Sequence, residues 1–421
     1  MTAASNPKAL RIALALTLVL VGKAGCGGTT VSHSKTSSDA VGKRIAVSHA
    51  EQEARSQPDI RLRNAYRCPQ HSLRMSPSLK GRGRFRFVDH LRVKGLLPRR
   101  VSIYLPPYYD RDLYQRYPVV YAHDGQFAFD KGLRIHRALD ELAAKQIIKP
   151  HILVTIDRSE QRSFELKPRL LDQPGPALDR YLSLLLNKVK PYIDQHFRTR
   201  CEGNATAVVG YSLGGLANMY IALQHSETFG RIAAMSPSLW WHRGQALQDW
   251  QAYKGPLPTR LWIDAGTREG RFGEVVPYFI QDTRRARDIA IHKGMTMGES
   301  LGYLEHEDAP HAGWAGAQRM RYALAFLLAE QRPIDHPAST LAVHVFRHKI
   351  FKHLPTTLAI TASYQDIFRL TWPNSAATFT SSNQRVAQVN LSGVVQGLAP
   401  GISIIEAQLN GLYDEDQIDV Y

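Results

Sequence analysis

The stretch "ATAVVGYSLGGLANMY" (residues 205–220) places a serine between glycines at the point where one hydrophobic pattern gives way to another. Its first half is a run of small and β-branched apolar residues typical of a buried strand, and a helical period follows the glycines. Glycines beside the turn let neighbouring backbone pass without a Cβ clash. The serine oxygen is then exposed beside the helix N-terminus, which favours a developing negative charge. We therefore predict that Ser212 is a nucleophile, with a simple tight turn as the alternative.

A nucleophilic serine needs a base and an acid that orients the base, and after a turn of this kind the chain order is Ser, acid, His. Two histidines, His306 and His311, lie in "YLEHEDAPHAGW" (303–314), which follows the expected last strand. We prefer His311 as the base because it lies further beyond the strand, next to Pro310 and just before the last helix. His306 is the alternative.

The acid should lie near the end of the strand in "LWIDAGTREG" (261–270). Asp264 falls inside that strand, whereas Glu269 falls in the loop just beyond it, where its side chain can reach an imidazole. We predict that Glu269 is the acid, with Asp264 and Asp308 in reserve.

Backbone N–H groups can supply the oxyanion hole that such a site needs. The candidates are the N–H of Leu213, which follows the serine, and the N–H of Gln126 in "VVYAHDGQF" (119–127). We expect no metal in "HEDAPH" (306–311), because its two histidines and two acids lack H-E-x-x-H or a comparable ligand spacing. A serine triad requires no cofactor, and none is predicted.

The hydrophobic pattern divides the chain into regions. From about residue 80 to 332, strands alternate with helices, which predicts a mainly parallel sheet covered on both faces. After Pro333, short β-type runs are separated by turn signals. We assign residues 79–332 to an α/β domain and residues 338–421 to a second, all-β domain.

The N-terminal residues are typical of an exported protein. Lys8 and Arg11 precede the apolar run "IALALTLVLVG" (12–22), which is too short to span a membrane. We predict a signal peptide over residues 1–25, with a core helix as the alternative. Residues 26–78 are polar and irregular and are predicted to be a linker.

The cysteines bear on the compartment. "KAGC" resembles a bacterial lipobox that would lipidate Cys26 and anchor the protein to a membrane, although Lys23 departs from that pattern and cleavage after Ala24 is the alternative. We expect a protein of the periplasm or cell envelope, with secretion as the alternative. Cys68 and Cys201 could then form a disulfide.

The formal net charge of +16 raises the question of a nucleic-acid partner. No zinc-finger spacing, aromatic RNA-binding signature or long Lys/Arg run is present in the sequence, so no nucleic-acid partner is predicted. A basic surface also suits anionic lipid, an anionic polymer or an acidic substrate.

Several segments together resemble the putative esterase family, which includes esterase D, enterochelin esterases and feruloyl esterases. They include "RRVSIYLPPYYD" (99–110), "YPVVYAHDGQFAFD" (117–130), "VVGYSLGGLANMY" (208–220) and "LWIDAGTREG" (261–270). The resemblance runs from about residue 83 to 330 and implies an α/β-hydrolase fold. It also implies Ser212 as nucleophile, Glu269 as acid and His311 as base, although the family's acid is often Asp.

Two further segments resemble parts of the family that border the substrate. "SPSLWW" supplies Trp240 and Trp241, which could form an aromatic wall for an acyl or sugar group, with ordinary packing as the alternative. "RSEQRSFEL" supplies Arg162, a candidate for binding an anionic group, and Tyr211 beside the nucleophile is also a candidate substrate contact.

The segment "ATFTSSNQRVAQVNLSGVVQGLAPGISIIEAQLNG" (377–411) resembles a bacterial Ig-like group 2 domain. That resemblance implies a β-sandwich that spaces, tethers or contacts the cell envelope. The sequence as a whole predicts an exported serine esterase that forms an acyl-enzyme from a siderophore, carbohydrate acyl or short-chain ester. An acyltransferase and a non-catalytic cell-surface binding protein are the alternatives.

Overall fold

The computed structural model describes residues 83–91, 94–168, 177–270 and 278–421. The predicted signal peptide (1–25), the lipidation site Cys26, the polar linker (26–78) and Cys68 lie outside these residues. Among the helices that are described, none is both long enough and apolar enough to cross a bilayer.

The first part of the described chain is built around an eight-stranded sheet with the order β1-β2-β4-β3-β5-β6-β7-β8. β1 and β2 pair antiparallel, β2 pairs antiparallel with β4, and all pairings from β4 to β8 are parallel. The strands are β1 (Arg84–Leu91), β2 (Arg99–Leu105), β3 (Val119–Ala122), β4 (Ile152–Ile156), β5 (Thr206–Tyr211), β6 (Arg231–Met235), β7 (Arg260–Gly266) and β8 (Leu301–His306). This mixed, mainly parallel sheet is of the α/β-hydrolase type.

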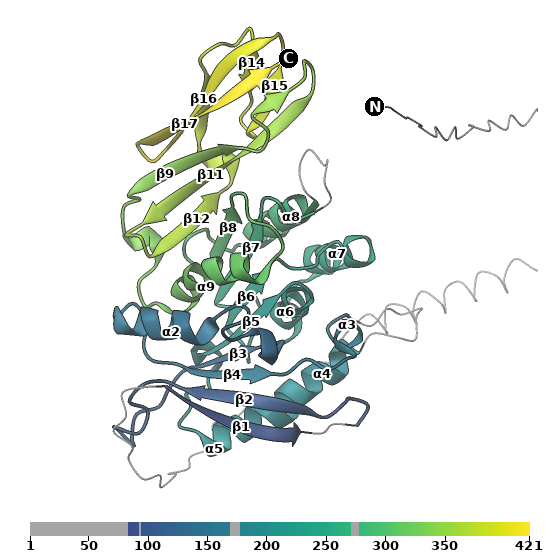
Figure 1. The fold of residues 1–421 in the computed structure, drawn as a ribbon, viewed down its shortest axis with the longest axis vertical. Coiled ribbons are helices and arrows are strands. Elements are labelled where there is room, and N and C mark those ends of the chain that lie inside the picture. The colour runs from purple at the N-terminus through teal and green to yellow at the C-terminus, as the bar shows by residue number, and fades with distance from the viewer. Residues whose placement is uncertain (1–82, 92–93, 169–176, 271–277) are drawn as a thin grey trace, which may run out of the picture. The chain divides into compact units, whose positions relative to one another are not determined.

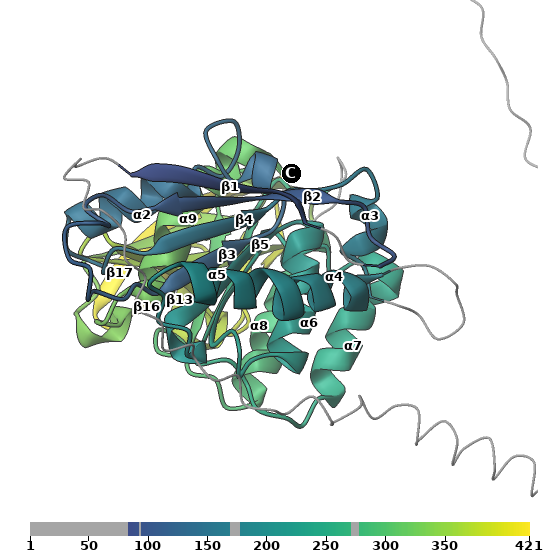
Figure 2. The ribbon, with the colours of Figure 1, turned by 90° about the horizontal axis from the view of Figure 1, so that it is seen from below.

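Helices cover both faces of this sheet (Figure 2). The central strands are continuous apolar runs because each face is buried, and successive side chains enter different cores. Val120 packs in the cluster that includes α2 and α9, whereas Val119 and Tyr121 pack in the cluster that includes α4 to α7. The helices are α2 (Ile135–Ala144), α3 (Arg162–Glu165), α4 (Leu178–Leu184), α5 (Lys190–His196), α6 (Leu213–Gln224), α7 (Gln245–Ala252), α8 (Tyr278–His292) and α9 (Gly313–Leu328).

The C-terminal part consists of strands of two to ten residues in two sheets, as the change of pattern after Pro333 predicts. One sheet has the order β10-β17-β16-β13; the other has the order β12-β11-β15-β14, with β9 also pairing with β11. The strands are β9 (Thr340–Val345), β10 (Lys349–Ile350), β11 (Pro355–Tyr364), β12 (Phe368–Trp372), β13 (Thr378–Ser381), β14 (Ala387–Val389), β15 (Val394–Gly397), β16 (Gly401–Leu409) and β17 (Leu412–Val420). Burial alternates along β16, so one face is packed and the other is exposed.

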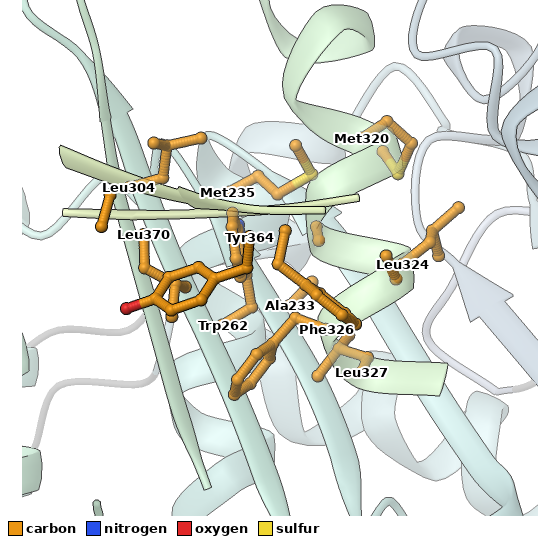
Figure 3. Packing of buried hydrophobic residues seen from close by; sticks show 14 of the residues in the cluster. Ala233, Met235, Trp262, Leu304, Met320, Leu324, Phe326, Leu327, Tyr364 and Leu370 are labelled. Carbon is orange, nitrogen blue, oxygen red and sulfur yellow. The ribbon is translucent and has the colours of Figure 1, made fainter. Parts of the chain in front are cut away.

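The C-terminal sheets pack directly on the α/β part. Trp262, Leu304 and Phe326 lie in one hydrophobic cluster with Tyr364 and Leu370 (Figure 3). The contact is also hydrogen-bonded. The backbone N–H of Glu305 donates to Thr371 Oγ1 at 2.9 Å, and the Arg284 guanidinium donates both to the Glu305 carboxylate and to the carbonyl of Leu358. The hydrophobic core of the α/β part therefore continues into β11 and β12, whose positions beside β8 are seen in Figure 1.

Candidate active site

Ser212 occupies the sharp turn between β5 and α6. Its φ of 61° and ψ of −117° lie in a region that L-residues seldom adopt, and such strain costs on the order of 1–3 kcal/mol. The glycines make the turn possible, because a Cβ on Gly210 would lie 2.2 Å from the carbonyl oxygen of Gly214. A Cβ on Gly215 would lie 2.7 Å from the carbonyl oxygen of Met235. Any larger residue at these two glycines would push the turn away from its neighbours.

Ser212 is half-buried, and its hydroxyl lies within hydrogen-bond distance of that of Ser238. The two Oγ atoms are 3.3 Å apart, and the N–H of Ser238 donates to the carbonyl of Ser212 at 3.1 Å. Within the described residues no hydrogen bond joins Ser212 to His311. Nucleophile–base hydrogen bonds are often long or misaligned before substrate binds, so this geometry is compatible with a base at His311.

His311 is bonded to the predicted acid. Its Nδ1 lies 2.7 Å from Glu269 Oε2, in the loop between β8 and α9. The imidazole also packs against Tyr211, with ring centroids 4.9 Å apart, and against Phe279 at 5.1 Å. Because Tyr211 precedes Ser212, these contacts hold the imidazole beside the serine turn. With Nδ1 bonded to Glu269, Nε2 is the ring nitrogen that can accept a proton.

Glu269 is fully buried in a network of donors. Its Oε1 accepts hydrogen bonds from Ser236 Oγ at 2.6 Å, the N–H of Gly266 at 2.8 Å and the Arg319 guanidinium at 3.2 Å. Burial favours a raised pKa, but the hydrogen bond from His311 and the charge of Arg319 outweigh it and lower the pKa of Glu269. The carboxylate facing His311 is therefore ionised at neutral pH.

The two reserve acids lie elsewhere. Asp264 is fully buried and accepts from Arg319 Nε at 3.0 Å and Trp262 Nε1 at 2.7 Å. Burial raises the pKa of Asp264, although Arg319 opposes that shift. Asp308 forms an exposed ion pair with Arg268 at 2.8 Å. Of the three candidate acids, Glu269 is the one that is hydrogen-bonded to His311.

The alternative base, His306, is the last residue of β8 and has no recorded hydrogen bond at Nδ1 within the described residues. Burial, with the nearby charges of Arg319 and Arg369, lowers the pKa of His306 to about 4. It is therefore neutral at neutral pH, and none of the carboxylates in the described part of the chain is hydrogen-bonded to it.

The predicted oxyanion donors come from two segments that lie close together. Leu213 is the first residue of α6, and Gln126 lies in the 3₁₀ turn Gly125–Phe127 after β3. Neither backbone N–H donates a hydrogen bond recorded within the described residues. A Cβ on Gly214 would lie 3.4 Å from His123 Cβ, so the start of α6 lies against the loop after β3.

His123 joins this loop to the helices, a role that the sequence analysis did not assign. Its Nε2 is 2.8 Å from Asn218 Oδ1 on α6, and its Nδ1 is 2.7 Å from the Tyr181 hydroxyl on α4. Burial lowers the pKa of His123. A neutral imidazole can donate to one partner and accept from the other, which fixes the loop next to the serine turn.

The residues predicted to contact substrate differ in their exposure and in the partners they already have. Trp240 is 46% exposed, whereas Trp241 is buried and packs in the core. Arg162 makes a bidentate pair with buried Asp124, through Nε at 2.5 Å and Nη2 at 2.7 Å, so its charge already has a partner. Tyr211 is buried against His311, and its hydroxyl donates to the carbonyl of Ala312 at 3.4 Å.

A separate cavity of about 1040 Å³ lies away from the serine turn, along α7 and α8. It is lined by several basic side chains, including Lys254, Arg285 and Lys293. None of the predicted site residues lines this cavity.

Two residues of the active-site network escaped the sequence analysis. Arg319 is completely buried and bridges Asp264 and Glu269 from α9. Arg319 lies in "GAQRMRYALAFLL" (316–328), where it is one of two arginines near the start of a helical segment that becomes apolar, and nothing local distinguishes it from Arg321. Ser236, which bonds both Glu269 and Arg319, carried no signal beyond its place at the end of β6.

The fold and the serine turn are of the α/β-hydrolase type, and comparison with known proteins finds esterases among the similar chains. Residues 97–304, just under half of the chain, match the family model described as "Putative esterase". The chain is 28% identical over 207 residues to the uncharacterized protein YbbA of Bacillus subtilis, a match that covers 47% of this chain and 80% of YbbA.

Other relatives are named as esterases. The chain is 25% identical to the iron(III) salmochelin esterase of Escherichia coli O6:H1, over 51% of this chain and 44% of that protein. The chain thus spans less than half the length of this relative. Among solved structures, the fold is similar to that of an IroE-like serine hydrolase from Shewanella oneidensis. The two sequences are 19% identical, the superposition covers 58% of this chain and 80% of that chain, and the TM-score is 0.47.

Proposed function

We propose that this protein is a serine carboxylic ester hydrolase in which Ser212, His311 and Glu269 form the catalytic triad. The observation that supports it most directly is the 2.7 Å hydrogen bond between His311 and buried Glu269, beside the strained turn at Ser212. A serine held in such a turn, with an oriented imidazole next to it, is the arrangement that acyl transfer through an acyl-enzyme needs.

The reaction would proceed in two proton-balanced steps. Ser212 Oγ attacks the ester carbonyl while His311 Nε2 takes its proton, and the N–H groups of Leu213 and Gln126 bind the oxyanion. His311 then gives that proton to the leaving alcohol, and the acyl group remains on Ser212. Water attacks the acyl-enzyme, with its proton passing through His311, and the acid is released. Glu269 stays ionised throughout, since its lowered pKa favours the carboxylate that stabilises the imidazolium.

The substrate class we propose is an ester of a small molecule, with a siderophore ester ahead of carbohydrate acyl and short-chain esters. The relative named as an iron(III) salmochelin esterase supports this order. The His311 side chain is 32% exposed, which gives water access to the base; an alcohol acceptor would have the same access, and product analysis with and without an added alcohol separates hydrolysis from acyl transfer.

The test is turnover of p-nitrophenyl acetate and butyrate by wild type, Ser212→Ala and Ser238→Ala. We expect Ser212→Ala to lose activity by about 10⁶-fold, as in serine hydrolases whose triad acts as a unit. Ser238→Ala is the matched control, because its hydroxyl lies 3.3 Å from that of Ser212 and is not the proposed nucleophile. Equal activity in wild type and Ser212→Ala would contradict the proposal.

We also propose that the protein is exported, with residues 1–25 as its signal peptide and Cys26 as the site of lipidation. Cys201 is disulfide-bonded, and disulfides persist in oxidising compartments outside the cytoplasm, which supports export. We propose Cys68 as its partner. Peptide mapping with and without reductant tests the pairing, and fractionation of cells expressing wild type or Cys26→Ala tests the anchor.

For the C-terminal sheets we propose a bacterial Ig-like β-sandwich that contacts the cell envelope. Two sheets whose pairings are antiparallel except for β10–β17, with alternating burial along β16, support a sandwich. Co-sedimentation of the Cys26→Ala chain with isolated envelopes tests the contact independently of the lipid anchor. Recovery of the protein in the supernatant alone would contradict it.

A further inference from the structure

Three potential metal ligands converge in the C-terminal part of the protein. His344 on β9, His348 in the connection to β10 and Asp416 on β17 each offer a ligand atom, and these atoms all lie within 4.8 Å of one another. The two imidazole rings are 6.0 Å apart between centroids, and His348 Nδ1 lies 3.3 Å from Asp416 Oδ1. The cluster arises because β9 and β17 lie alongside each other, although their residues are about 70 positions apart in the chain.

A fourth candidate ligand reaches the cluster from the α/β part. Glu307 Oε1 lies 3.0 Å from His344 Nδ1. Glu307 belongs to the loop between β8 and α9, four residues before His311. The four side chains therefore come from three separate segments of the chain.

Backbone contacts orient Asp416 within this group. Its Oδ2 accepts from the N–H of Val345 and its Oδ1 from the N–H of Gln417, both at 2.8 Å. Such outer contacts hold a metal-binding carboxylate in place. His344 is largely buried, with 15% of its side chain exposed, whereas His348 is 53% exposed and leaves the cluster open to an ion from solvent.

The chemistry of the four side chains selects a transition metal. Imidazole nitrogen with carboxylate oxygen suits Zn²⁺, whereas Mg²⁺ and Ca²⁺ prefer oxygen ligands alone. Ligand atoms about 2.0–2.2 Å from Zn²⁺ in a tetrahedron lie about 3.3–3.6 Å from each other. The distance between His348 Nδ1 and Asp416 Oδ1 already has this value, but Nδ1 also lies 3.2 Å from the carbonyl oxygen of Gln417 and must give up that contact to bind an ion. The Glu307–His344 distance is slightly shorter, and the widest separation among His344, His348 and Asp416 needs to close by little more than 1 Å.

We propose that His344, His348 and Asp416 bind one Zn²⁺ ion, with Glu307 as the fourth protein ligand. The ion would tie the loop between β8 and α9 to the C-terminal sheets without touching the serine turn. Because Zn²⁺ would bind the folded chain, it should also raise the temperature of unfolding.

The test is a calorimetric titration of ZnCl₂ into the full chain, produced without an affinity tag and dialysed against a chelator, then against buffer. We expect a single ion per chain, no comparable binding of MgCl₂, and at least about a tenfold weaker affinity for His348→Ala and for Asp416→Asn. His292→Ala is the matched control. It removes an exposed histidine at the end of α8 and should bind Zn²⁺ as wild type does.

Melting curves without metal keep the result interpretable, since a variant that melts like wild type has not lost its fold. His348→Ala is the safest variant in this respect because the side chain is mostly exposed. Equal Zn²⁺ affinity in wild type, His348→Ala and Asp416→Asn would overturn the site. Unchanged affinity in Glu307→Gln alone would remove Glu307 from the ligand set.

Discussion

The loop between β8 and α9 contributes one residue to each of two histidine–carboxylate pairs, Glu307 to one and His311 to the other. The two pairs differ in how deeply the carboxylate is buried. Glu269 and His311 are 2.7 Å apart, and the carboxylate is fully buried. Glu307 and His344 are 3.0 Å apart, and the Glu307 side chain is 53% exposed. The first carboxylate is also bonded to Ser236, Gly266 and Arg319, which fix its charge and its direction.

The difference shows that a histidine–carboxylate contact does not define a function by itself. A buried, fully bonded carboxylate holds one imidazole nitrogen and leaves the other free to transfer a proton. An exposed carboxylate that lies near several imidazoles can instead bind a metal ion together with them, in place of its hydrogen bond from a histidine. The surroundings of each pair therefore set what it can do.

The largest expected difference between the pairs is in turnover when the histidine is removed. His311→Ala should lower kcat for p-nitrophenyl butyrate by about 10⁶-fold, because the serine loses its base. His344→Ala should leave kcat within about twofold of wild type, since this pair lies outside the proposed triad. A comparable loss of turnover in both variants would contradict the claim that only the Glu269–His311 pair takes part in catalysis.

Substitution of the two glutamates should change kcat in the same unequal way, although the loss is smaller than for the histidines. Glu269→Gln should reduce kcat by about 10⁴-fold, because a neutral amide no longer holds the required tautomer or stabilises the imidazolium. Glu307→Gln is its matched control and should reduce kcat by no more than about twofold. Both can be measured with the same ester at saturating concentration.

The buried network behind the first pair should be costly to break. Arg319→Met removes the cation that lies between Asp264 and Glu269 and leaves two buried carboxylates without it. Breaking a buried ion pair in this way costs about 3–5 kcal/mol of unfolding free energy. Urea denaturation checks this, with Arg268→Met as control, because the Arg268–Asp308 pair is exposed and should contribute at most about 1 kcal/mol.

The smallest effect concerns acid stability. The pKa of Glu269 is lower in the folded protein than its ordinary value, so its ionised form contributes stability above the unfolded pKa of about 4.3. That contribution is lost as the pH falls through the lowered folded value. The difference in unfolding free energy between wild type and Glu269→Gln should therefore shrink below about pH 4, as urea melts at several pH values would show. A difference that grows on acidification would mean that the pKa is raised instead.

The parts of the fold and site that sequence could predict are those with local signals. The serine turn was visible because its strand, glycines and helix are contiguous, and Glu269 and His311 could be proposed because each follows a recognisable strand. Arg319 could not be assigned a role, since only the packing of α9 on the sheet brings it to Glu269 from 50 positions away.

The cluster of His344, His348 and Asp416 could not be predicted from sequence, because it depends on contact between strands that are far apart in the chain. His344 and Asp416 share no local motif, and they meet only because β9 lies beside β17. The motif "HEDAPH" alone lacked metal-ligand spacing, and Glu307 meets His344 only because the C-terminal sheets pack beside its loop. Arg162 shows the reverse case, because a cation predicted to bind substrate pairs with Asp124, which lies 38 positions earlier.

The measurement that tests the triad most directly is mass spectrometry of the protein after reaction with a fluorophosphonate, which labels activated serines. We predict one adduct, located on Ser212, in wild type and in Ser238→Ala, and none in Ser212→Ala. An adduct on Ser238, or an unlabelled wild-type protein whose fold is intact by circular dichroism, would contradict the assignment of Ser212 as the nucleophile.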